Sequence, residues 1–370
     1  MKNLLVSVFL LTTVNNTALQ EKASITEENF SRIPAAGNVF IITTDGFRWQ
    51  EIFNGADSAL INNEKYTPDT GTLKLMYWEN SLEERRKKLM PFFWNVLFKK
   101  GQLFGNRNYD NKVNVSNVWS ISYPGYNEIF TGTDDRTVSS NQKINNANLN
   151  VLEFLNNKEP YKGKVVAFTS WDVFPYILNE QRNGLAVNAG YENIKDDNFS
   201  STQLLINKVQ DEAINKKEAT RHDALTFETA KEYLKKNKPK VLYLGLGETD
   251  EFAHHERYDL YLQQANNIDK MITELWHWVQ TTPGYKDNTT FIITTDHGRG
   301  KRAANWGKHG FFTGGSSQTW LALIGPGIQP FGEIKENQQI YQKQLAQTIA
   351  ALLGEKFEAN HKIASALALQ

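Results

Sequence analysis

Short apolar runs alternate with longer amphipathic stretches along most of the chain. Four runs are rich in β-branched residues and stop abruptly at polar residues: 39–44, 164–169, 240–246 and 291–295. Runs of this kind, bounded by turn-forming residues, are typical of buried parallel strands. Shorter runs predict further strands at 102–104, 113–115 and 319–324.

Stretches with helical spacing of apolar residues lie between these runs. They predict helices at 92–100, 122–132, 151–155, 201–215, 223–236, 259–281 and 342–353, and the charged stretch 81–88 is also helical in propensity. The stretch 53–77 lacks clean periodicity and is expected to be loop or a small insertion. The stretch 183–199 is rich in Asn and Gly and is expected to be loop.

Alternation of strands with helices predicts an α/β fold, with a mainly parallel central sheet covered by helices on both faces. The length of the chain suits one large domain, which we place at 33–370. The longer gaps between strands predict cap-like insertions near 53–112 and 175–235.

The N-terminus has the features of a secretory signal. A lysine at position 2 precedes the apolar run 4–11, which is too short to span a bilayer as a stable helix. We therefore expect a signal peptide within 1–20 and export to a periplasm or out of the cell, although residues 16–20 match a cleavage site poorly.

Composition narrows the possible chemistry. Lys+Arg and Asp+Glu balance at 41 each, so net charge gives no indication of binding to nucleic acid or to a membrane surface. The chain has no cysteine, which excludes thiolate nucleophiles and disulfides. Any bound metal must therefore be held by His, Asp or Glu.

Two strands end in the same way. The run 40–44 and the run 291–295 both read Phe-Ile-Ile-Thr-Thr and are followed by Asp45 and Asp296. Ligands of open α/β sheets bind beyond the carboxyl ends of the strands. Either aspartate taken alone could simply open a turn, but together they predict two carboxylates delivered to one crevice.

Histidines stand close to these acidic residues. Asp250 and His254 are four positions apart, so one helical turn or a tight loop can bring both onto one cation; His297 follows Asp296, and His309 lies between glycine-rich segments. Mixed nitrogen and oxygen ligands suit Zn²⁺ or Mn²⁺. Two such cations can clamp the attacking and leaving oxygens of a phosphoryl transfer.

Ser122 is the candidate nucleophile for such a site. It opens the helix predicted at 122–132, with Pro124 in the first turn and Gly132 past the end. A helix N-terminus offers amides and a positive dipole end to a phosphate. Local sequence alone favours an ordinary helix N-cap, and the nucleophile stays open as the other interpretation at this point.

The order of these motifs resembles the alkaline phosphatase superfamily of metallohydrolases, most closely its nucleotide pyrophosphatase/phosphodiesterase-like branch. The resemblance runs from about residue 39 to the last helix. It rests on five motifs in order: Thr44-Asp45-Gly46-Phe47-Arg48, Ser122-Tyr123-Pro124 with Thr131-Gly132, Asp250-x-x-x-His254, Asp296-His297-Gly298 and His309-Gly310.

The resemblance implies two divalent metal ions, most simply zinc, with manganese as the alternative. It implies that Asp250, His254 and His309 hold one ion, and that Asp45, Asp296, His297 and Ser122 hold the other. Ser122 would be the nucleophile of a phospho-seryl intermediate, where many relatives have threonine. Asn141 matches the asparagine that contacts the phosphoryl oxygen in relatives.

The resemblance also bears on the substrate, a small phosphate ester or a nucleotide. Ser122-Tyr123-Pro124-Gly125-Tyr126 lacks the arginine of the sulfatase maturation motif. Monoesterases of this branch carry a Lys and an Arg where this chain has Ser170-Trp171-Asp172. These differences favour a phosphodiesterase or pyrophosphatase.

Other interpretations remain. Trp171 is a candidate to stack on a substrate, with core packing as the alternative, and Arg48, Arg299 or Arg302 could supply the missing charge of a monoesterase. A non-catalytic binding protein on the same fold is the competing class of function. The sequence does not give the oligomeric state.

Overall fold

The computed structural model describes residues 36–214 and 220–369, which belong to one compact unit spanning residues 34–370. The expected signal peptide at 1–20 lies outside the described residues. Within the described part of the chain, no helix is long and apolar enough to cross a membrane.

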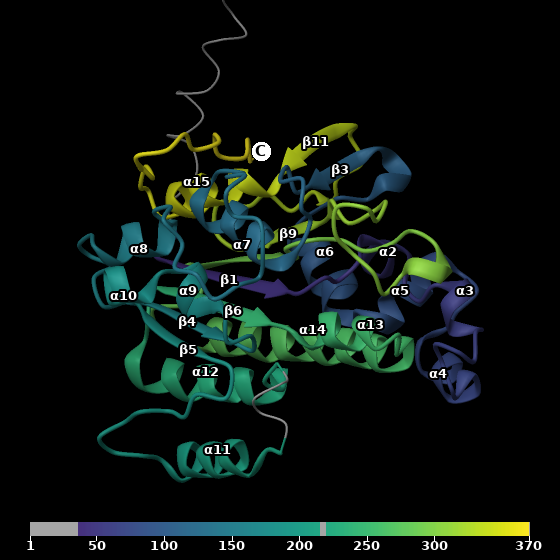
Figure 1. Cartoon of the computed structure of the whole chain (residues 1–370), viewed down its shortest axis with the longest axis horizontal. Coiled ribbons are helices and arrows are strands. Elements are labelled where there is room, and N and C mark those ends of the chain that lie inside the picture. Colours follow the sequence, from purple (N-terminus) through teal and green to yellow (C-terminus); the bar gives the residue numbers. More distant parts are fainter. Residues whose placement is uncertain (1–35, 215–219, 370) are drawn as a thin grey trace, which may run out of the picture. The chain divides into compact units, whose positions relative to one another are not determined.

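An eight-stranded sheet forms the centre of the fold (Figure 1), in the order β10-β2-β9-β7-β1-β6-β4-β5. Its strands are β1 Asn38–Thr44, β2 Gly101–Phe104, β4 Val165–Thr169, β5 Ala186–Ala189, β6 Val241–Leu246, β7 Thr289–Thr294, β9 Leu321–Ile324 and β10 Gly332–Glu333. Only β9 runs antiparallel to its neighbours, β2 and β7. The predicted mainly parallel sheet is confirmed, with this one reversed strand.

The predicted strand 319–324 is divided between two sheets. β8 Gln318–Thr319 belongs to a small sheet with β3 Asn111–Asn114 and β11 Gln338–Tyr341, whereas β9 belongs to the large one. The division falls at Trp320, whose buried indole Nε1 donates a hydrogen bond to the Phe47 carbonyl at 2.9 Å. A bend between two packed sheets leaves no mark in the alternation of apolar residues.

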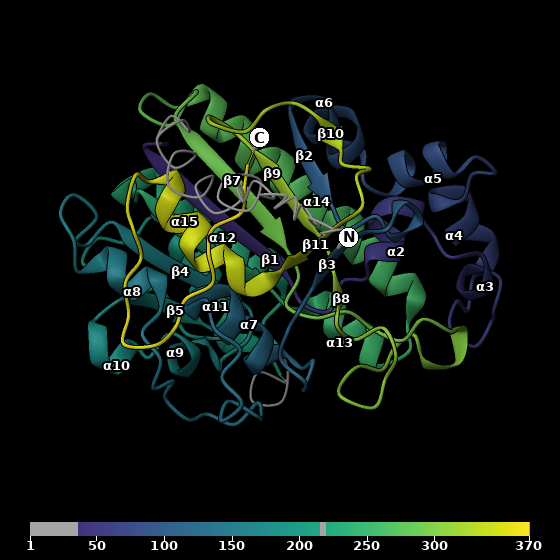
Figure 2. The same cartoon turned by 90° about the horizontal axis from the view of Figure 1, so that it is seen from above.

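Helices cover both faces of the large sheet, as predicted. Figures 1 and 2 show α12 Asp223–Asn237 and α14 Tyr258–Thr281 on one face, and α7 Ser122–Thr131 and α15 Leu345–Leu352 on the other. Every residue of β1, β6 and β7 is buried between these layers. A strand that is covered on both faces needs apolar or satisfied side chains at every position, which explains the continuous runs in the sequence.

The prediction of loop at 53–77 is wrong. This stretch contains the end of α2 Trp49–Asn54, then α3 Ser58–Ile61 and α4 Thr70–Tyr77. Asp57 and Asp69 cap α3 and α4 by accepting the backbone N–H groups of Ala59 and Thr72. The helices are too short to show a helical period, so the capping aspartates were the better signal.

The prediction of loop at 183–199 is wrong in part, because β5 lies within it and extends the sheet beside β4. Two short helices, α9 Phe174–Ile177 and α10 Glu180–Asn183, precede β5, and α11 Ser201–Glu212 follows it. The remaining helical segments are α5 Leu82–Leu89, the π-helical turn Phe93–Leu97 with α6 Phe98–Lys100, α8 Val151–Asn156, α13 Glu248–His254 and the 3₁₀ turns Arg107–Tyr109, Ala303–Asn305 and Gln342–Gln344.

Candidate active site

Three neighbouring strands deliver the candidate ligands to one edge of the sheet. β1 lies between β6 and β7, with Thr44 opposite Leu246 and Thr43 opposite Thr294. Because the three strands run parallel in this register, the chain leaves each of them at the same level. Asp45 follows β1, Asp296 follows β7, and α13 with Asp250 follows β6.

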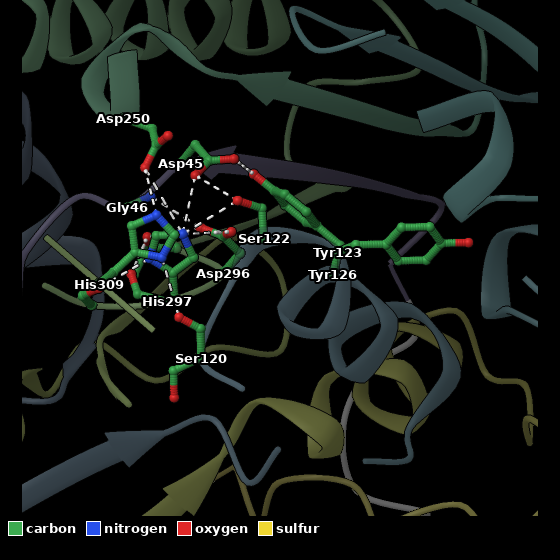
Figure 3. Close-up of polar contacts among 12 residues, drawn as sticks. Asp45, Gly46, Ser120, Ser122, Tyr123, Tyr126, Asp250, Asp296, His297 and His309 are labelled. Carbon is green, nitrogen blue, oxygen red and sulfur yellow. Dashed lines mark hydrogen bonds and ion pairs between the residues drawn. The ribbon is translucent and has the colours of Figure 1, made fainter. Parts of the chain in front are cut away.

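Asp45, Asp296 and His297 form a buried group (Figure 3). The Nε2 atom of His297 lies 3.5 Å from Asp45 Oδ1 and 3.5 Å from Asp296 Oδ2. One oxygen or nitrogen atom from each of the three lies within 4.8 Å of the others, close enough to share one cation. Residues predicted from two distant strand ends therefore meet in space.

Asp250, His254 and His309 lie beside this group. α13 places Asp250 and His254 on one helical turn, with His254 Nε2 3.1 Å from Asp250 Oδ2. His309 Nε2 lies 3.1 Å from His254 Nε2 and 3.9 Å from Asp250 Oδ1. Asp250 and His309 also group with His297, whose ring stacks on His309 with 3.9 Å between centroids. The two groups therefore form one continuous cluster.

Two backbone carbonyls orient the imidazoles. His297 Nδ1 lies 3.0 Å from the Gly298 carbonyl and His309 Nδ1 lies 3.3 Å from the Ser120 carbonyl. A carbonyl oxygen only accepts hydrogen bonds, so both Nδ1 atoms carry the proton. The Nε2 lone pairs of the neutral rings are then directed at the carboxylates, which is the arrangement of metal-ligating histidines.

Ser122 lies inside the cluster. Its Oγ is 3.3 Å from His297 Nε2 and 3.5 Å from Asp45 Oδ1. The alternative interpretation, in which Ser122 caps α7, is wrong: Ile121 holds the cap position, and Ser122 is the first residue of the helix. Its hydroxyl is therefore free of a capping bond and directed at the carboxylates and His297. Gly132 ends the helix in the left-handed conformation, with φ 74°, as predicted.

A glycine lets α7 approach the metal-ligand candidates this closely. A Cβ at Gly125 would lie 2.4 Å from the Asp296 carbonyl oxygen, a distance that no side chain tolerates. The side chain of Asn141 lies beside the first turn of the same helix, because its Oδ1 accepts the Tyr123 N–H at 3.0 Å. The structure thus brings Asn141 to the residue beside Ser122.

Burial favours the neutral forms of the ionisable groups in the cluster. Burial, together with the nearby Asp296 carboxylate, raises the pKa of Asp45 to about 7. Burial likewise raises the pKa of Asp296 to about 7, and it lowers the pKa of His297 and His309. Groups that favour their neutral forms in this way gain strongly from a bound cation.

The donor set fits divalent metal ions. Asp296 Oδ2 is buried without a hydrogen-bond partner among the described residues, although a buried carboxylate oxygen is costly unless it binds something. Carboxylates and imidazole Nε2 atoms are ligands for Zn²⁺ or Mn²⁺.

The structure does not bring Arg48 to the cluster. Its guanidinium is buried and pairs with Glu51 and with Asp57. Trp171 lies after β4 and packs edge-on against Phe174, with 6.2 Å between ring centroids. Phe174 in turn packs on Tyr126, so two rings lie between Trp171 and the cluster.

Three further residues support the cluster and were not predicted in these roles. Tyr126 donates its hydroxyl to Asp45 Oδ2 at 3.0 Å. The buried Arg299 pairs with Asp250 and donates to the carbonyls of Gly46 and Gly307. Burial lowers the pKa of Arg299 to about 9.

The third is Asp223, a buried carboxylate that accepts four hydrogen bonds. Ser170 Oγ and the Gly247 N–H donate to Oδ1, and the Glu248 N–H and Gln264 Nε2 donate to Oδ2. Gly247 and Glu248 open α13, so Asp223 fixes the helix that carries Asp250 and His254. The Asp in the first turn of α12 was the only signal of it in the sequence.

With this geometry in place, sequence comparison becomes informative. Residues 60–307 match the type I phosphodiesterase/nucleotide pyrophosphatase family. The chain belongs to this family. The matched segment includes Ser122, Asp250, His254, Asp296 and His297. No curated protein matches the chain in sequence.

Solved structures share the fold of this family member. The alkaline phosphatase PafA is 11% identical, with a TM-score of 0.56 over 88% of this chain and 97% of PafA. The lipoteichoic acid synthase LtaP from Listeria monocytogenes is 14% identical, with a TM-score of 0.55 over 90% of this chain and 79% of LtaP. A putative sulfatase from Bacteroides thetaiotaomicron is 13% identical, with a TM-score of 0.55 over 90% and 73% of the two chains. At these identities the likeness concerns the fold alone.

Proposed function

We propose that this protein hydrolyses phosphodiesters through a phospho-seryl intermediate formed at Ser122. The observation that carries the proposal is the position of Ser122 Oγ, 3.3 Å from His297 Nε2 and 3.5 Å from Asp45 Oδ1. A serine on a helix N-terminus, within a cluster of potential metal ligands, suits attack on phosphorus.

The reaction has two displacements. Ser122 Oγ forms a bond to phosphorus while the bond to the leaving oxygen breaks; a water oxygen then forms a bond to phosphorus while the bond to Ser122 Oγ breaks. In the first displacement the serine proton is released to solvent and the leaving oxygen takes one up. In the second displacement the attacking water loses one proton and Ser122 Oγ regains one. Two divalent ions, zinc or manganese, would lower the pKa of the hydroxyl and of water and would neutralise the phosphoryl oxygens.

Residues of the chain prepare both displacements. Asp250, His254 and His309 would hold one ion, and Asp45, Asp296 and His297 the other. Asn141 would donate its amide N–H to an equatorial phosphoryl oxygen, because its Oδ1 is already engaged by the Tyr123 N–H. Tyr126 holds Asp45 in place.

The turn after β4 supports a diester over a monoester. A monoester carries one more negative charge, so its recognition needs a free cation close to phosphorus. Lys143 reaches this turn from the Asn141 loop, but it pairs with Asp172, with 2.6 Å between Nζ and Oδ2.

Hydrolysis of bis-p-nitrophenyl phosphate and p-nitrophenyl phosphate, with and without chelator, tests the proposal. We expect faster turnover of the diester, loss of turnover on chelation, and loss in Ser122→Ala with bound metal retained. Ser120→Ala is the matched control, because the Ser120 side chain makes no hydrogen bond within the described structure. Full activity of Ser122→Ala would refute the assignment of Ser122 as the nucleophile. Faster turnover of the monoester would favour a phosphatase. Metal binding without turnover of either ester would favour a binding protein.

We also propose that the protein is exported, on the basis of the apolar run 4–11 after Lys2. N-terminal sequencing of the protein from its native cell would test this. Detection of an intact Met1 in the mature protein would contradict removal of a signal peptide.

A further inference from the structure

Five exposed side chains share one loop beside the candidate active site. Phe311 and Phe312 follow the metal-ligand candidate His309 and are 61% and 96% exposed. Lys301, Arg302 and Lys308 precede them and are exposed as well. These five residues are called the basic–aromatic loop below.

The two phenylalanines have little contact with the core. Their rings pack edge-on against each other, with 4.9 Å between centroids. A phenyl ring that is almost fully exposed forgoes the hydrophobic stabilisation of about 1.5–3 kcal/mol that burial would give. Two adjacent rings in this position indicate a surface that is covered in the functional state.

The three cations of the loop are unpaired. Among the described residues, none of Lys301, Arg302 and Lys308 has a carboxylate within ion-pair distance. Other lysines of the described chain do form ion pairs, as Lys65 does with Glu256 at 2.6 Å. The neutral net charge of the whole chain therefore conceals a local excess of positive charge.

Backbone hydrogen bonds hold the loop in shape. The Thr313 N–H donates to the Gly310 carbonyl at 2.9 Å, the Gly300 N–H to the Lys308 carbonyl at 2.9 Å, and the Lys301 N–H to the Gly314 carbonyl at 3.3 Å. The cations and the phenylalanines are therefore displayed together on one ordered support.

The loop adjoins the chain that leads into Ser122. A Cβ at Gly310 would lie 3.7 Å from the Ile121 side chain, and His309 Nδ1 donates to the Ser120 carbonyl. Figure 2 shows the yellow-green segment that follows β7 beyond the carboxyl ends of β1 and β7. Whatever covers the loop therefore lies next to the candidate active site.

We propose that the basic–aromatic loop docks the protein on an anionic lipid surface. Aromatic rings insert at the level of the headgroups, and lysines and arginines beside them bind lipid phosphates. Unpaired cations around an exposed apolar pair match this surface, whereas an apolar protein partner would leave the cations uncompensated. Docking would place Ser122 near headgroup phosphates, so a lipid headgroup phosphodiester becomes the substrate class; this consequence rests on the proposed function.

Co-sedimentation with vesicles tests the docking. One set contains phosphatidylcholine alone, and the other contains equal parts of phosphatidylcholine and phosphatidylglycerol. We expect binding to the anionic vesicles that weakens with added salt. Phe312→Ala should lower the partition coefficient about tenfold, and Lys301→Gln should lower it about fivefold.

Matched controls come from the opposite edge of the sheet. Phe331 is 54% exposed and precedes β10, and the exposed Lys99 precedes β2. Phe331→Ala and Lys99→Gln should bind anionic vesicles as the unchanged protein does. All of these proteins keep the apolar run 4–11, so its contribution cancels in the comparison.

Two outcomes would overturn the docking: absence of binding to anionic vesicles, and equal losses in Phe312→Ala and Phe331→Ala. If vesicle binding is absent, a raised KM for an aryl diester in Phe312→Ala would make the rings a substrate subsite. Self-association that Phe312→Ala abolishes would instead make them a contact between copies of the chain. Hydrolysis of bis-p-nitrophenyl phosphate is measured separately, so failure of docking and failure of the proposed function are distinguishable.

Discussion

Removal of one hydroxyl, in Tyr126→Phe, tests how the cluster is held together. Tyr126 is buried, its hydroxyl donates to Asp45 Oδ2 at 3.0 Å, and its ring packs on Phe174 with 4.6 Å between centroids. Phenylalanine keeps the ring contact and loses the hydroxyl that donates to Asp45. The variant therefore isolates the contribution of one oxygen atom to the placement of Asp45.

The magnitude follows from two lines of reasoning. Loss of a donor to a buried carboxylate costs about 1–3 kcal/mol of the free energy of unfolding. Loss of a group that orients a metal ligand lowers metal affinity about 10–100-fold, or about 1.4–2.7 kcal/mol of binding free energy. The two ranges overlap, because the same hydrogen bond is lost in each case.

Titration of Zn²⁺ against a competing chelator measures the affinity, and urea unfolding of the metal-free protein measures the stability. Tyr285→Phe is the matched control: this buried tyrosine donates to the Pro239 carbonyl at 2.6 Å, away from the cluster. It should lose stability without losing metal affinity. Wild-type affinity in Tyr126→Phe, or an equal loss in Tyr285→Phe, would refute the role of Tyr126.

Further predictions concern three other buried positions. Asp223→Ala should weaken metal binding about 10–100-fold, because α13 loses its acceptor; unchanged affinity in a chelator competition would contradict this. Gly125→Ala should lower the free energy of unfolding by about 1–3 kcal/mol, because the new methyl group clashes with the Asp296 carbonyl, and it should also lower turnover. Gly71→Ala in α4 is the control: it has room for a methyl group and should raise the free energy of unfolding by up to about 1 kcal/mol. Burial raises the pKa of Asp269 to about 7, so the native state binds a proton that the unfolded state releases above about 3.9. The contribution of Asp269 to the free energy of unfolding is therefore full below about pH 4. It falls as pH rises from there through about 7, by up to about 4 kcal/mol in total. Urea unfolding of Asp269→Asn should show a smaller fall over this range, and an unchanged pH profile would argue against the assignment.

Local sequence patterns predict much of the fold. β1, β4, β6 and β7 lie where the apolar runs predict them, because strands buried on both faces require continuous apolar residues. α14 follows the same logic, with buried residues at helical spacing. The candidate ligands could be predicted because polar residues at strand ends interrupt these runs.

The short elements could not be predicted in this way. α3 and α4 span about one or two turns each, so their stability comes from capping aspartates and packing rather than from a repeated pattern. Local sequence left the Ser122 hydroxyl open to a capping bond, whereas the tertiary structure places it 3.5 Å from Asp45 Oδ1.

The sequence by itself determined which side chains the strand ends present, and the family resemblance assigned them to two metal ions. Only the tertiary structure decided that β1 lies between β6 and β7, that β9 runs backwards, and that His297 lies close to both ligand groups. It alone placed Tyr126, Asp223 and Arg299 behind the ligands. The physical reason is that these contacts join residues far apart in the chain, and a local pattern carries no information about its distant partners.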